Sequence, residues 1–492
     1  MSLIDIKGLT FSYDGGSNAV FDDVSFSLDT DWRTGLIGRN GRGKTTLLKL
    51  LAGEYEYRGK IASSVACTYF PFAVKDEHRT AGEILAETCP DAAEWAIARE
   101  LSLLKTDEGI LYMPFSTLSC GERTKVLLAG LFAADHGFLL IDEPTNHLDA
   151  AGRENVARYL KRKKGFILVS HDRAFLDGCV DHIVSIGRSE IEVTSGNFST
   201  WQQNYERRTA YETTQNERLE KDIARLAEAE KRAAAWADKT ERSKYGKASS
   251  GLKQDKGYVG HKAAKMMARA KSVERRRQAA IEQKSALLRN VEKTAELKLS
   301  PLYPRAERLV SLSDVDIFYG DKKACGPISL ELLRGERVAL CGGNGCGKSS
   351  ILKLIVGESM RHDGTFKLAS GLVVSYVPQS ADGLCGGLSK FAARCGIDES
   401  LFKTVLRKLD FRREDFDGDI STFSQGRKKK VALAASLCTQ AHLYVWDEPL
   451  NYVDIYSRMQ LESLLLEYAP TMLFVEHDKA FRDAVATRTI EL

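Results

Sequence analysis

The sequence repeats itself at a nearly constant interval, and this repeat constrains its fold more than any other feature. The segment GRNGRGKT at residues 38–45 returns as GGNGCGKS at residues 342–349, with the two lysines 304 residues apart. The segment FLLIDEP at residues 138–144 returns as LYVWDEP at residues 443–449. Seven such landmarks keep one order at offsets of 304 to 307 residues. A constant offset over this length indicates a duplicated domain.

Composition excludes several classes of protein. With 43% hydrophobic residues, the 492-residue chain can bury large cores, so a wholly disordered chain is excluded. The sequence contains no run of 18 consecutive apolar residues, and residues 1–8 lack the basic and apolar segments of an export signal. Its ten cysteines are scattered, without a metal-binding spacing. We therefore expect a cytoplasmic protein with reduced thiols and no membrane contact.

Each copy has the order strand, glycine loop, helix that a phosphate loop requires. The alternating pattern predicts strands at residues 3–9, 20–28, 310–317 and 328–333, and helices at residues 45–51 and 349–355. The apolar runs 138–141 and 443–446 each end in Asp-Glu, which is typical of a buried parallel strand that delivers carboxylates at its C-terminal edge. The fold class predicted is α/β, with two P-loop nucleotide-binding domains.

The glycine loops fit the pattern G-x-x-x-x-G-K-[ST], which binds nucleotide phosphates. Glycines let backbone N–H groups wrap the phosphates, the lysine neutralises the β and γ oxygens, and the hydroxyl holds magnesium. The residues predicted to bind ATP in the first loop are Gly38, Asn40, Gly41, Gly43, Lys44, Thr45 and Thr46. Those in the second loop are Gly342, Asn344, Gly345, Gly347, Lys348, Ser349 and Ser350.

The Asp-Glu pairs supply the remaining groups for ATP hydrolysis. Asp142 and Asp447 are expected to hold Mg²⁺ through water, together with Thr45 and Ser349. Glu143 and Glu448 are expected to polarise the attacking water, because phosphoryl transfer depends mainly on positioning and charge stabilisation.

At these residues the sequence resembles the ATP-binding cassette ATPases. Residues 118–122 (LSCGE) resemble the family's signature motif, which implies that Ser119 and Gly121, and likewise Ser424 and Gly426, reach across a dimer interface to ATP on the other cassette. The resemblance implies further roles: adenine stacking for Tyr13 and Tyr319, a switch histidine for His171 and His477, and coupling of the two sites by Asp149 and Asp454. For the tyrosines, an ordinary position at a strand end is the alternative.

Two departures from the family pattern fall in one composite site. The family glutamine that contacts magnesium and water is Gln379 in the second cassette, but Phe72 stands there in the first. The second signature reads FSQGR at residues 423–427 and has lost several consensus positions. Because the first phosphate loop faces the second signature, we expect the site of Lys44 to be the weaker one. The alternative is that both sites hydrolyse ATP normally.

The basic charge lies between the copies. Residues 206–299 hold 24 Lys and Arg against 14 Asp and Glu, although the whole chain carries a net charge of only +4. The periodicity of this segment predicts an antiparallel helical hairpin with a tip at about 243–260. The first helix would have about 35 residues and span about 50 Å. Such a segment suits RNA phosphates, with aromatic side chains available for stacking. The candidates for contact with RNA are Lys244, Tyr245, Lys247, Lys253, Lys256, Tyr258, Lys262, Lys265 and Arg269.

Tandem cassettes with this linker resemble the F-type cassette proteins (ABC-F), and most of all the Lsa-type antibiotic-resistance branch. The resemblance implies an ATP- and Mg²⁺-dependent protein, a monomer whose two cassettes pair, that binds the exit (E) site of the 70S ribosome near 23S rRNA and P-site tRNA. It would protect the ribosome from lincosamides, pleuromutilins and streptogramin A. The domains expected are a first cassette at 1–205, the linker at 206–299 and a second cassette at 300–492. A translation factor of the same family and, less well, a transporter motor or DNA-repair ATPase are the alternatives.

Overall fold

The computed structural model of the chain describes residues 2–13, 19–134, 137–146, 148–187, 190–243, 275, 297–320, 322–343, 345–411 and 413–492. Two compact units are distinguished, one formed by Met1–Trp201 with Thr294–Leu492 and the other by Gln202–Lys293. Both cassettes lie in the first unit, so the expected boundaries at 1–205, 206–299 and 300–492 stay a prediction.

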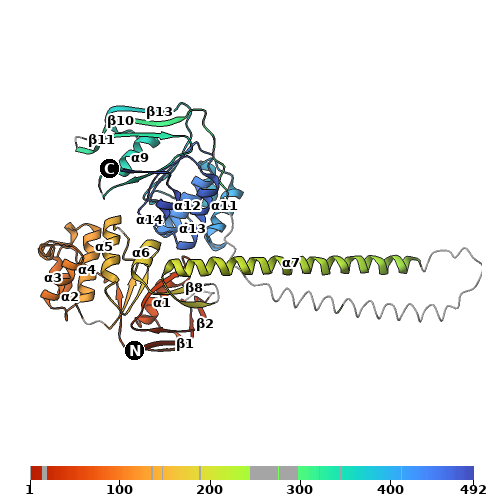
Figure 1. Ribbon diagram of the computed structural model, residues 1–492, viewed down its shortest axis with the longest axis horizontal. Helices are drawn as coiled ribbons and strands as arrows, with labels where there is room; N and C mark the ends of the chain where they lie inside the picture. Colours follow the sequence, from red (N-terminus) through yellow and green to blue (C-terminus); the bar gives the residue numbers. More distant parts are fainter. Residues whose placement is uncertain are drawn as a thin grey trace, which may run out of the picture. The chain divides into compact units, whose positions relative to one another are not determined.

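The first cassette has nine strands and six α-helices in its described part (Figure 1). Its strands are β1 (Leu3–Phe11), β2 (Phe21–Asp29), β3 (Arg33–Gly38), β4 (Arg58–Ala62), β5 (Cys67–Phe70), β6 (Phe138–Asp142), β7 (Phe166–Val169), β8 (His182–Ile186) and β9 (Ile191–Ser195). Its helices are α1 (Lys44–Leu51), α2 (Ala81–Thr88), α3 (Glu94–Leu103), α4 (Cys120–Ala133), α5 (Ala150–Leu160) and α6 (Arg173–Cys179), with 3₁₀ turns at Glu108–Tyr112 and Phe115–Thr117.

The second cassette repeats this order of elements as far as the counterpart of β8 (Figure 1). Its strands are β10 (Arg308–Tyr319), β11 (Lys322–Leu333), β12 (Arg337–Cys341), β13 (Arg361–Leu368), β14 (Val374–Val377), β15 (Leu443–Asp447), β16 (Met472–Val475) and β17 (Arg488–Glu491). Its helices are α9 (Lys348–Val356), α10 (Leu388–Arg394), α11 (Glu399–Lys408), α12 (Gln425–Cys438), α13 (Ile455–Tyr468) and α14 (Lys479–Val485), with 3₁₀ turns at Arg413–Asp417 and Ile420–Thr422.

Each cassette combines a small antiparallel sheet with a mainly parallel one. The antiparallel sheets have the orders β2-β1-β4 and β11-β10-β13, and the larger sheets have the orders β5-β6-β7-β3-β8-β9 and β14-β15-β16-β12-β17. The strand that precedes each phosphate loop pairs in parallel on both sides, β3 with β7 and β8, and β12 with β16 and β17. The apolar runs that end in Asp-Glu are the buried parallel strands β6 and β15, as the sequence predicts.

The helix after each phosphate loop packs between the two sheets of its cassette. In the first cassette, Leu47, Leu48 and Leu50 of α1 are buried with Ile6 of β1 and Leu140 of β6. Burying such a side chain contributes about 1.5–3 kcal/mol. The phosphate loop is therefore anchored at both ends, by a central strand before it and a buried helix after it.

The helix that leaves the first cassette corrects the expected length of the linker helix. It is α7 (Phe198–Ser243), which has 46 residues rather than about 35. The helix begins earlier because its first turn belongs to the cassette: Phe198 and Trp201 are buried there, and Asn197 Oδ1 accepts a hydrogen bond from the N–H of Thr200. The predicted tip after residue 243 and the return helix lie outside the described residues.

None of the helices that the structure describes combines the length and the apolar character needed to cross a bilayer.

Candidate functional site

The two phosphate loops share a left-handed glycine directly before the lysine. Gly43 and Gly347, directly before each lysine, have φ angles of 91° and 93°, in the left-handed region. A Cβ atom at Gly43 would lie 2.6 Å from Cγ1 of Val20, and one at Gly347 would lie 2.3 Å from Cβ of Cys325. A side chain at either position would therefore strain the loop and push it off the antiparallel sheet.

The loop lysines are buried and their ammonium groups lie inside the loops. Lys44 Nζ donates to the carbonyl oxygens of Gly38 (2.8 Å) and Arg39 (3.3 Å). Lys348 Nζ donates to those of Gly342 (3.0 Å) and Gly343 (2.8 Å). Each ammonium is thus held where the loop's glycine-rich backbone would wrap a phosphate.

The predicted magnesium ligands are brought together at the ends of β6 and β15. Thr45 Oγ1 donates to Asp142 Oδ2 over 2.7 Å, and Tyr69 OH donates to the same oxygen over 3.1 Å. In the second cassette, Asp447 is fully buried, and neither of its carboxylate oxygens has a hydrogen-bond partner in the part of the chain that the structure describes. Burial raises the pKa of this carboxyl group. Buried oxygen ligands beside a loop hydroxyl fit a hard divalent cation.

The protein alone would not complete such a coordination shell. Among the described residues, no three His, Cys, Asp or Glu side chains cluster in a way that could hold a metal. Mg²⁺ usually keeps several waters and is bound through one or two carboxylates together with substrate phosphates. Asp142 with Thr45, and Asp447 with Ser349, are the residues that would hold it.

The candidate catalytic glutamates follow directly after these strands in a strained conformation. Glu143 and Glu448 have φ angles of 49° and 45°, which are uncommon for a residue with a side chain. Each glutamate N–H donates to a neighbouring strand over 2.9 Å, from Glu143 to Val169 and from Glu448 to Val475. Strain of this kind persists where the surrounding structure fixes it, and here it turns the side chain toward the switch histidine.

The switch histidines lie beside these glutamates in both cassettes. His171 Nε2 is 3.3 Å from Glu143 Oε1, and His477 Nε2 is 3.5 Å from Glu448 Oε1. Burial lowers the pKa of His171, and the nearby Lys44 ammonium lowers it further. Because the two pairs have the same geometry, the repeat extends from the sequence to the arrangement of catalytic groups.

The electrostatic settings of the two glutamates differ. Burial, with the neighbouring Asp142, raises the pKa of Glu143 to about 7. Burial also acts on Glu448, but His477, Gln379 and Asn451 outweigh it and hold its pKa at about 2. Gln379 Nε2 donates to Glu448 Oε1 over 2.9 Å, and Asn451 Nδ2 donates to Oε2 over 2.5 Å. The glutamine that the first cassette replaces with Phe72 thus acts directly on the second glutamate.

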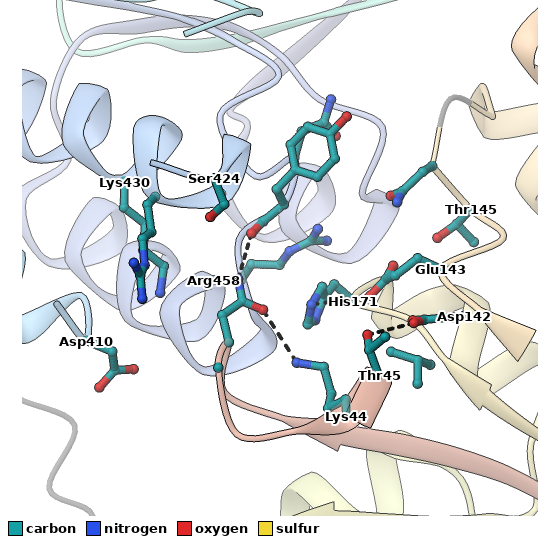
Figure 2. Close-up of a pocket in the computed structure, with 18 of the residues that line it drawn as sticks. Lys44, Thr45, Asp142, Glu143, Thr145, His171, Asp410, Ser424, Lys430 and Arg458 are labelled. Atoms are coloured by element: carbon teal, nitrogen blue, oxygen red, sulfur yellow. Dashed lines mark hydrogen bonds and ion pairs between the residues drawn. The ribbon is translucent and has the colours of Figure 1, made fainter. Parts of the chain in front are cut away.

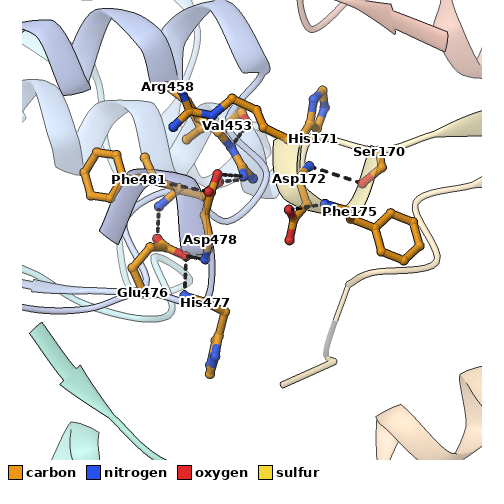
Figure 3. A network of polar contacts seen from close by, with 12 residues as sticks. Ser170, His171, Asp172, Phe175, Val453, Arg458, Glu476, His477, Asp478 and Phe481 are labelled. Atoms are coloured by element: carbon orange, nitrogen blue, oxygen red, sulfur yellow. Dashed lines mark hydrogen bonds and ion pairs between the residues drawn. The ribbon is translucent and has the colours of Figure 1, made fainter. Parts of the chain in front are cut away.

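Behind each histidine, an arginine joins the loop after the Asp-Glu strand to the aspartate of the switch motif. In the second cassette Arg458 donates to the carbonyls of Val453 (2.9 Å) and Leu450 (2.8 Å) and to Asp478 Oδ2 (3.0 Å) (Figure 3). In the first, Arg153 donates to the carbonyl of Leu148 (3.0 Å) and to Asp172 Oδ2 (2.9 Å). These contacts hold the segment that is predicted to couple the two sites in a fixed position relative to the histidine.

Sequence reasoning missed these two arginines, although the repeat carries the signal for them. Arg153 and Arg458 are 305 residues apart, the same offset as Glu143 and Glu448. An arginine on a helix is usually a solvated surface residue, so only its recurrence at the repeat offset could have identified it.

A cavity of about 670 Å³ lies between the first phosphate loop and the second signature (Figure 2). Its walls include Lys44, Thr45 and Glu143 from the first cassette and Ser424 and Gly426 from the second. The family resemblance implies this composite arrangement, because it pairs each phosphate loop with the signature of the other copy. Ser424 lies across this cavity from Lys44 (Figure 2).

Direct contacts join the two cassettes around this cavity. Asn40 Nδ2 donates to the carbonyl oxygen of Tyr452 over 2.8 Å. Arg39, which is buried, forms an ion pair with Asp410, and its guanidinium lies 5.4 Å from the centre of the Tyr456 ring. The positions that match Arg39 and Asp410 in the opposite cassettes are Gly343 and Lys105, which cannot repeat this ion pair.

The two signature serines have different hydrogen bonds. Ser119 is the N-cap of α4 and forms a capping box with Glu122, whose carboxylate accepts from the Ser119 hydroxyl over 2.7 Å. Ser424 is the N-cap of α12 without a side-chain capping bond, and Arg427 occupies the position of Glu122. The lining of the cavity includes neither Ser119 nor Gly121. The second composite site, Lys348 with Ser119, therefore remains a prediction.

The candidate adenine-stacking tyrosines lie at the ends of the antiparallel sheets, half exposed, and contact the helix after each loop. The hydroxyl of Tyr13 is 2.7 Å from Oγ1 of Thr46, and the hydroxyl of Tyr319 accepts from Ser350 Oγ over 3.3 Å. Each ring thus lies at the edge of its phosphate loop. This placement suits stacking on a base whose phosphates the loop holds.

Several predicted residues lie outside the described part of the chain. They are Asn344 of the second phosphate loop and all the candidate ribosome contacts, namely Lys244, Tyr245, Lys247, Lys253, Lys256, Tyr258, Lys262, Lys265 and Arg269.

Duplicated phosphate loops, each with a buried Asp-Glu strand and a switch histidine, define a tandem P-loop ATPase. The family model described as ABC transporter matches residues 21–146 and 325–451, which together make up just over half of the chain. The chain therefore belongs to this family of ATP-binding cassette proteins, and it is an ATPase.

The chain is similar to characterised proteins over nearly its whole length. It is 28% identical to the ribosome protection protein VmlR of Bacillus subtilis, over 96% of this chain and 83% of VmlR. It is 25% identical to the energy-dependent translational throttle protein EttA of Escherichia coli K12, over 96% of this chain and 89% of EttA. These relatives support the ABC-F branch of the family.

Among solved structures, the chain resembles the archaeal ribosome recycling factor aABCE1 in its complex with the stalk protein aP1. The TM-score is 0.61 at 21% identity, over 98% of this chain and 87% of that one. This similarity supports the tandem-cassette fold.

Proposed function

We propose that this protein is a ribosome-binding ATPase of the ABC-F group that protects ribosomes from antibiotics of the peptidyl-transferase centre. The observation that carries the proposal is the basic segment between the cassettes, in which residues 239–277 hold 13 Lys and Arg against 3 Asp and Glu. A membrane transporter motor would not need a segment of this charge and length. RNA offers the phosphate density that a local excess of positive charge would neutralise.

The relatives add support at the level of the whole chain. VmlR, a ribosome protection protein, aligns with nearly all of this sequence, including both cassettes and the segment between them. We propose that the chain binds the exit site of the 70S ribosome, next to P-site tRNA, and that the linker tip extends toward 23S rRNA. We further propose the Lsa-type specificity, for lincosamides, pleuromutilins and streptogramin A.

We also propose that the two ATP sites differ, with Mg²⁺-dependent hydrolysis mainly at the site of Lys348. The Gln379 side chain donates to Glu448 there, whereas the side chain of Phe72 has no hydrogen-bond donor. The first site is held by contacts between the cassettes, such as Asn40 with Tyr452. The Lys44 site would then hold ATP between the cassettes, and the Lys348 site would hydrolyse it. Together the two sites would let the cassettes close and reopen on the ribosome in cycles.

Drug susceptibility tests the proposal most directly. A sensitive strain that expresses the protein should tolerate higher concentrations of the three drug classes than the same strain with an empty vector. A matched strain that expresses Glu143→Gln with Glu448→Gln separates turnover from mere binding, because both phosphate loops remain intact. Unchanged tolerance to all three classes with the parent protein would refute the protective function.

Shortening the segment 243–260 tests the role of the linker. Protection should be lost while ATP turnover in the absence of ribosomes stays nearly unchanged, because the catalytic groups described above lie in the cassettes. Full protection by the shortened chain would place the functional residues elsewhere.

A translation factor without a role in resistance is the second candidate, because EttA, a translational throttle protein, also aligns with nearly the whole chain. Co-sedimentation with ribosomes in ATP, without any gain in drug tolerance, would favour this function. If the protein does not co-sediment with ribosomes in ATP, both the protective function and the translation-factor function are refuted.

A further inference from the structure

A buried lysine in the second cassette has no part in the catalytic groups described so far. Lys429 lies in α12, five residues after Ser424, and only 2% of it is exposed. Its ammonium donates to three backbone carbonyls: Pro378 (2.6 Å), Gln379 (3.1 Å) and Asp447 (2.9 Å). An ammonium has three N–H donors and no acceptor, so all its hydrogen-bonding capacity is used here.

The three carbonyls belong to two segments that both contribute to the Lys348 site. Pro378 and Gln379 follow strand β14, and Asp447 ends strand β15. The Gln379 side chain donates to Glu448, the residue next to Asp447. Lys429 therefore joins the backbone that carries the glutamine to the backbone that carries the glutamate.

The first cassette lacks this connection. The position equivalent to Lys429 is Thr124, five residues after Ser119, and the Thr124 hydroxyl donates to the carbonyl of Cys120 within its own helix over 3.0 Å. Phe72 replaces the glutamine in the same cassette. The lysine and the glutamine thus occur together in the second cassette, and neither occurs at the matching position of the first.

We propose that Lys429 is a positioning residue for ATP hydrolysis at the Lys348 site. Burying a charge is costly unless hydrogen bonds compensate for it, and here charge-assisted bonds fix two loop carbonyls against the Asp447 strand. With this bridge, the amide of Gln379 stays in reach of the Glu448 carboxylate. The inference rests on the proposal that this site carries most of the turnover.

The first experiment measures ATP turnover of Lys429→Met in a Glu143→Gln background, where hydrolysis depends on the Lys348 site. A displacement of about 1 Å can cost about 100-fold in rate. We expect kcat to fall by about tenfold or more, with KM and the affinity for a fluorescent ATP analogue nearly unchanged. The matched controls, Lys428→Met on the same helix and Thr124→Val in the first cassette, should keep the parental rate. A parental kcat for Lys429→Met would overturn the proposal.

A double-variant cycle separates positioning from general stability. If Lys429 acts through Gln379, Lys429→Met combined with Gln379→Ala should lose no more activity than the more damaging single change. Losses that multiply would overturn the proposal, as would equal decreases in kcat and nucleotide affinity with a lower melting temperature.

The outcome stays interpretable if the unequal-site proposal fails. Should Glu143→Gln alone abolish turnover, that proposal is refuted, and the same cycle is then measured in the parent chain. If Lys429→Met still lowers only kcat, and adds nothing to the loss caused by Gln379→Ala, the positioning role of Lys429 is supported in the parent chain as well. Losses that multiply refute that role.

Discussion

The amide of Gln379 donates a hydrogen bond to the carboxylate of Glu448 over 2.9 Å. At the matching position of the first cassette, the Phe72 ring lies in an edge contact with Phe70, with ring centres 6.1 Å apart. Glu448 therefore has a polar neighbour that can orient it and an attacking water, whereas the residue at the matching position of the first cassette is aromatic and packs against Phe70. This difference makes the two ATP sites distinguishable by single substitutions.

Glu448→Gln should slow ATP turnover far more than Glu143→Gln. Losing a general base costs about 100-fold to 10,000-fold at the site where it acts. If most turnover occurs at the Lys348 site, Glu448→Gln should leave under about a tenth of the parental rate, and Glu143→Gln should leave more than about half. Steady-state phosphate release measures both. Equal rates for the two single variants would contradict unequal sites.

Restoring the missing glutamine should activate the first site. In a Glu448→Gln background, Phe72→Gln should raise the residual rate of phosphate release, because an amide would again lie near Glu143. Phe72→Leu is the control, since it removes the ring without adding a hydrogen-bond donor. The lost ring contact should cost only about 0.5–1.5 kcal/mol of stability. No gain over Phe72→Leu would mean that the weakness of this site has another cause, such as the altered second signature.

The strands, phosphate loops and catalytic carboxylates could be predicted because each depends on local sequence. The run 138–141 is apolar because β6 is buried on both faces, and Gly43 is a glycine because its φ angle and the close approach of Val20 require one. The composite cavity could also be predicted, but only through the family resemblance.

The contacts that connect these local motifs could not be predicted in the same way. Arg39 and Asp410 are 371 residues apart, and neither belongs to a motif that implies a partner. Lys429 occurs in a run of basic residues, RKKK at 427–430, that is more typical of a solvated helix face. Only the packing of α12 reveals that two lysines of this run, Lys429 and Lys430, are buried. The predicted length of the linker helix was wrong for a similar reason. Burial of Phe198 and Trp201 extends α7 into the cassette.

Acid should weaken the first cassette through Glu100, which is completely buried. Its carboxylate accepts hydrogen bonds from Lys163 (2.6 Å), Tyr159 (2.7 Å) and Arg99 (2.8 Å). Burial alone would raise the pKa of Glu100, but these bonds outweigh it, so the pKa lies below the ordinary value of a glutamate. The stability that Glu100 contributes is therefore fully present above that value and is lost as the pH falls through the lowered pKa of the folded state.

Glu100→Gln tests this dependence. The substitution should lower the free energy of unfolding at pH 7 by about 1–3 kcal/mol, because the three donors lose a charged acceptor in a buried place. Thermal melts at pH 7 and pH 3 measure the effect, and the difference between parent and variant should shrink at the lower pH. A constant difference at both pH values would show that ionisation of Glu100 does not contribute.

Arg173 and Glu462 form an ion pair between the cassettes, with Nη2 of Arg173 2.5 Å from Oε2 of Glu462. Both side chains are largely buried, and removing one partner of a buried pair leaves a charge without compensation. Arg173→Glu and Glu462→Arg should each lower the melting temperature and the ATPase rate, and the double swap should recover part of both. The expected coupling is about 0.5–3 kcal/mol from the double-mutant cycle. Additive losses would mean that the pair is incidental to the joining of the cassettes.

The linker lysines should determine how ribosome binding responds to salt. If the basic segment neutralises RNA phosphates, each contact releases counterions and contributes about 0.7–0.9 to the slope of log K against log salt concentration. Replacing Lys262, Lys265 and Arg269 by Ala should weaken ribosome binding and make that slope shallower by about two to three. Co-sedimentation at several salt concentrations provides the slope. Replacing the exposed Lys7, Lys60 and Lys75 of the first cassette changes the net charge equally and should leave the slope unaltered. Equal effects of the two triple variants would assign the salt dependence to overall charge and remove the argument that the linker binds RNA.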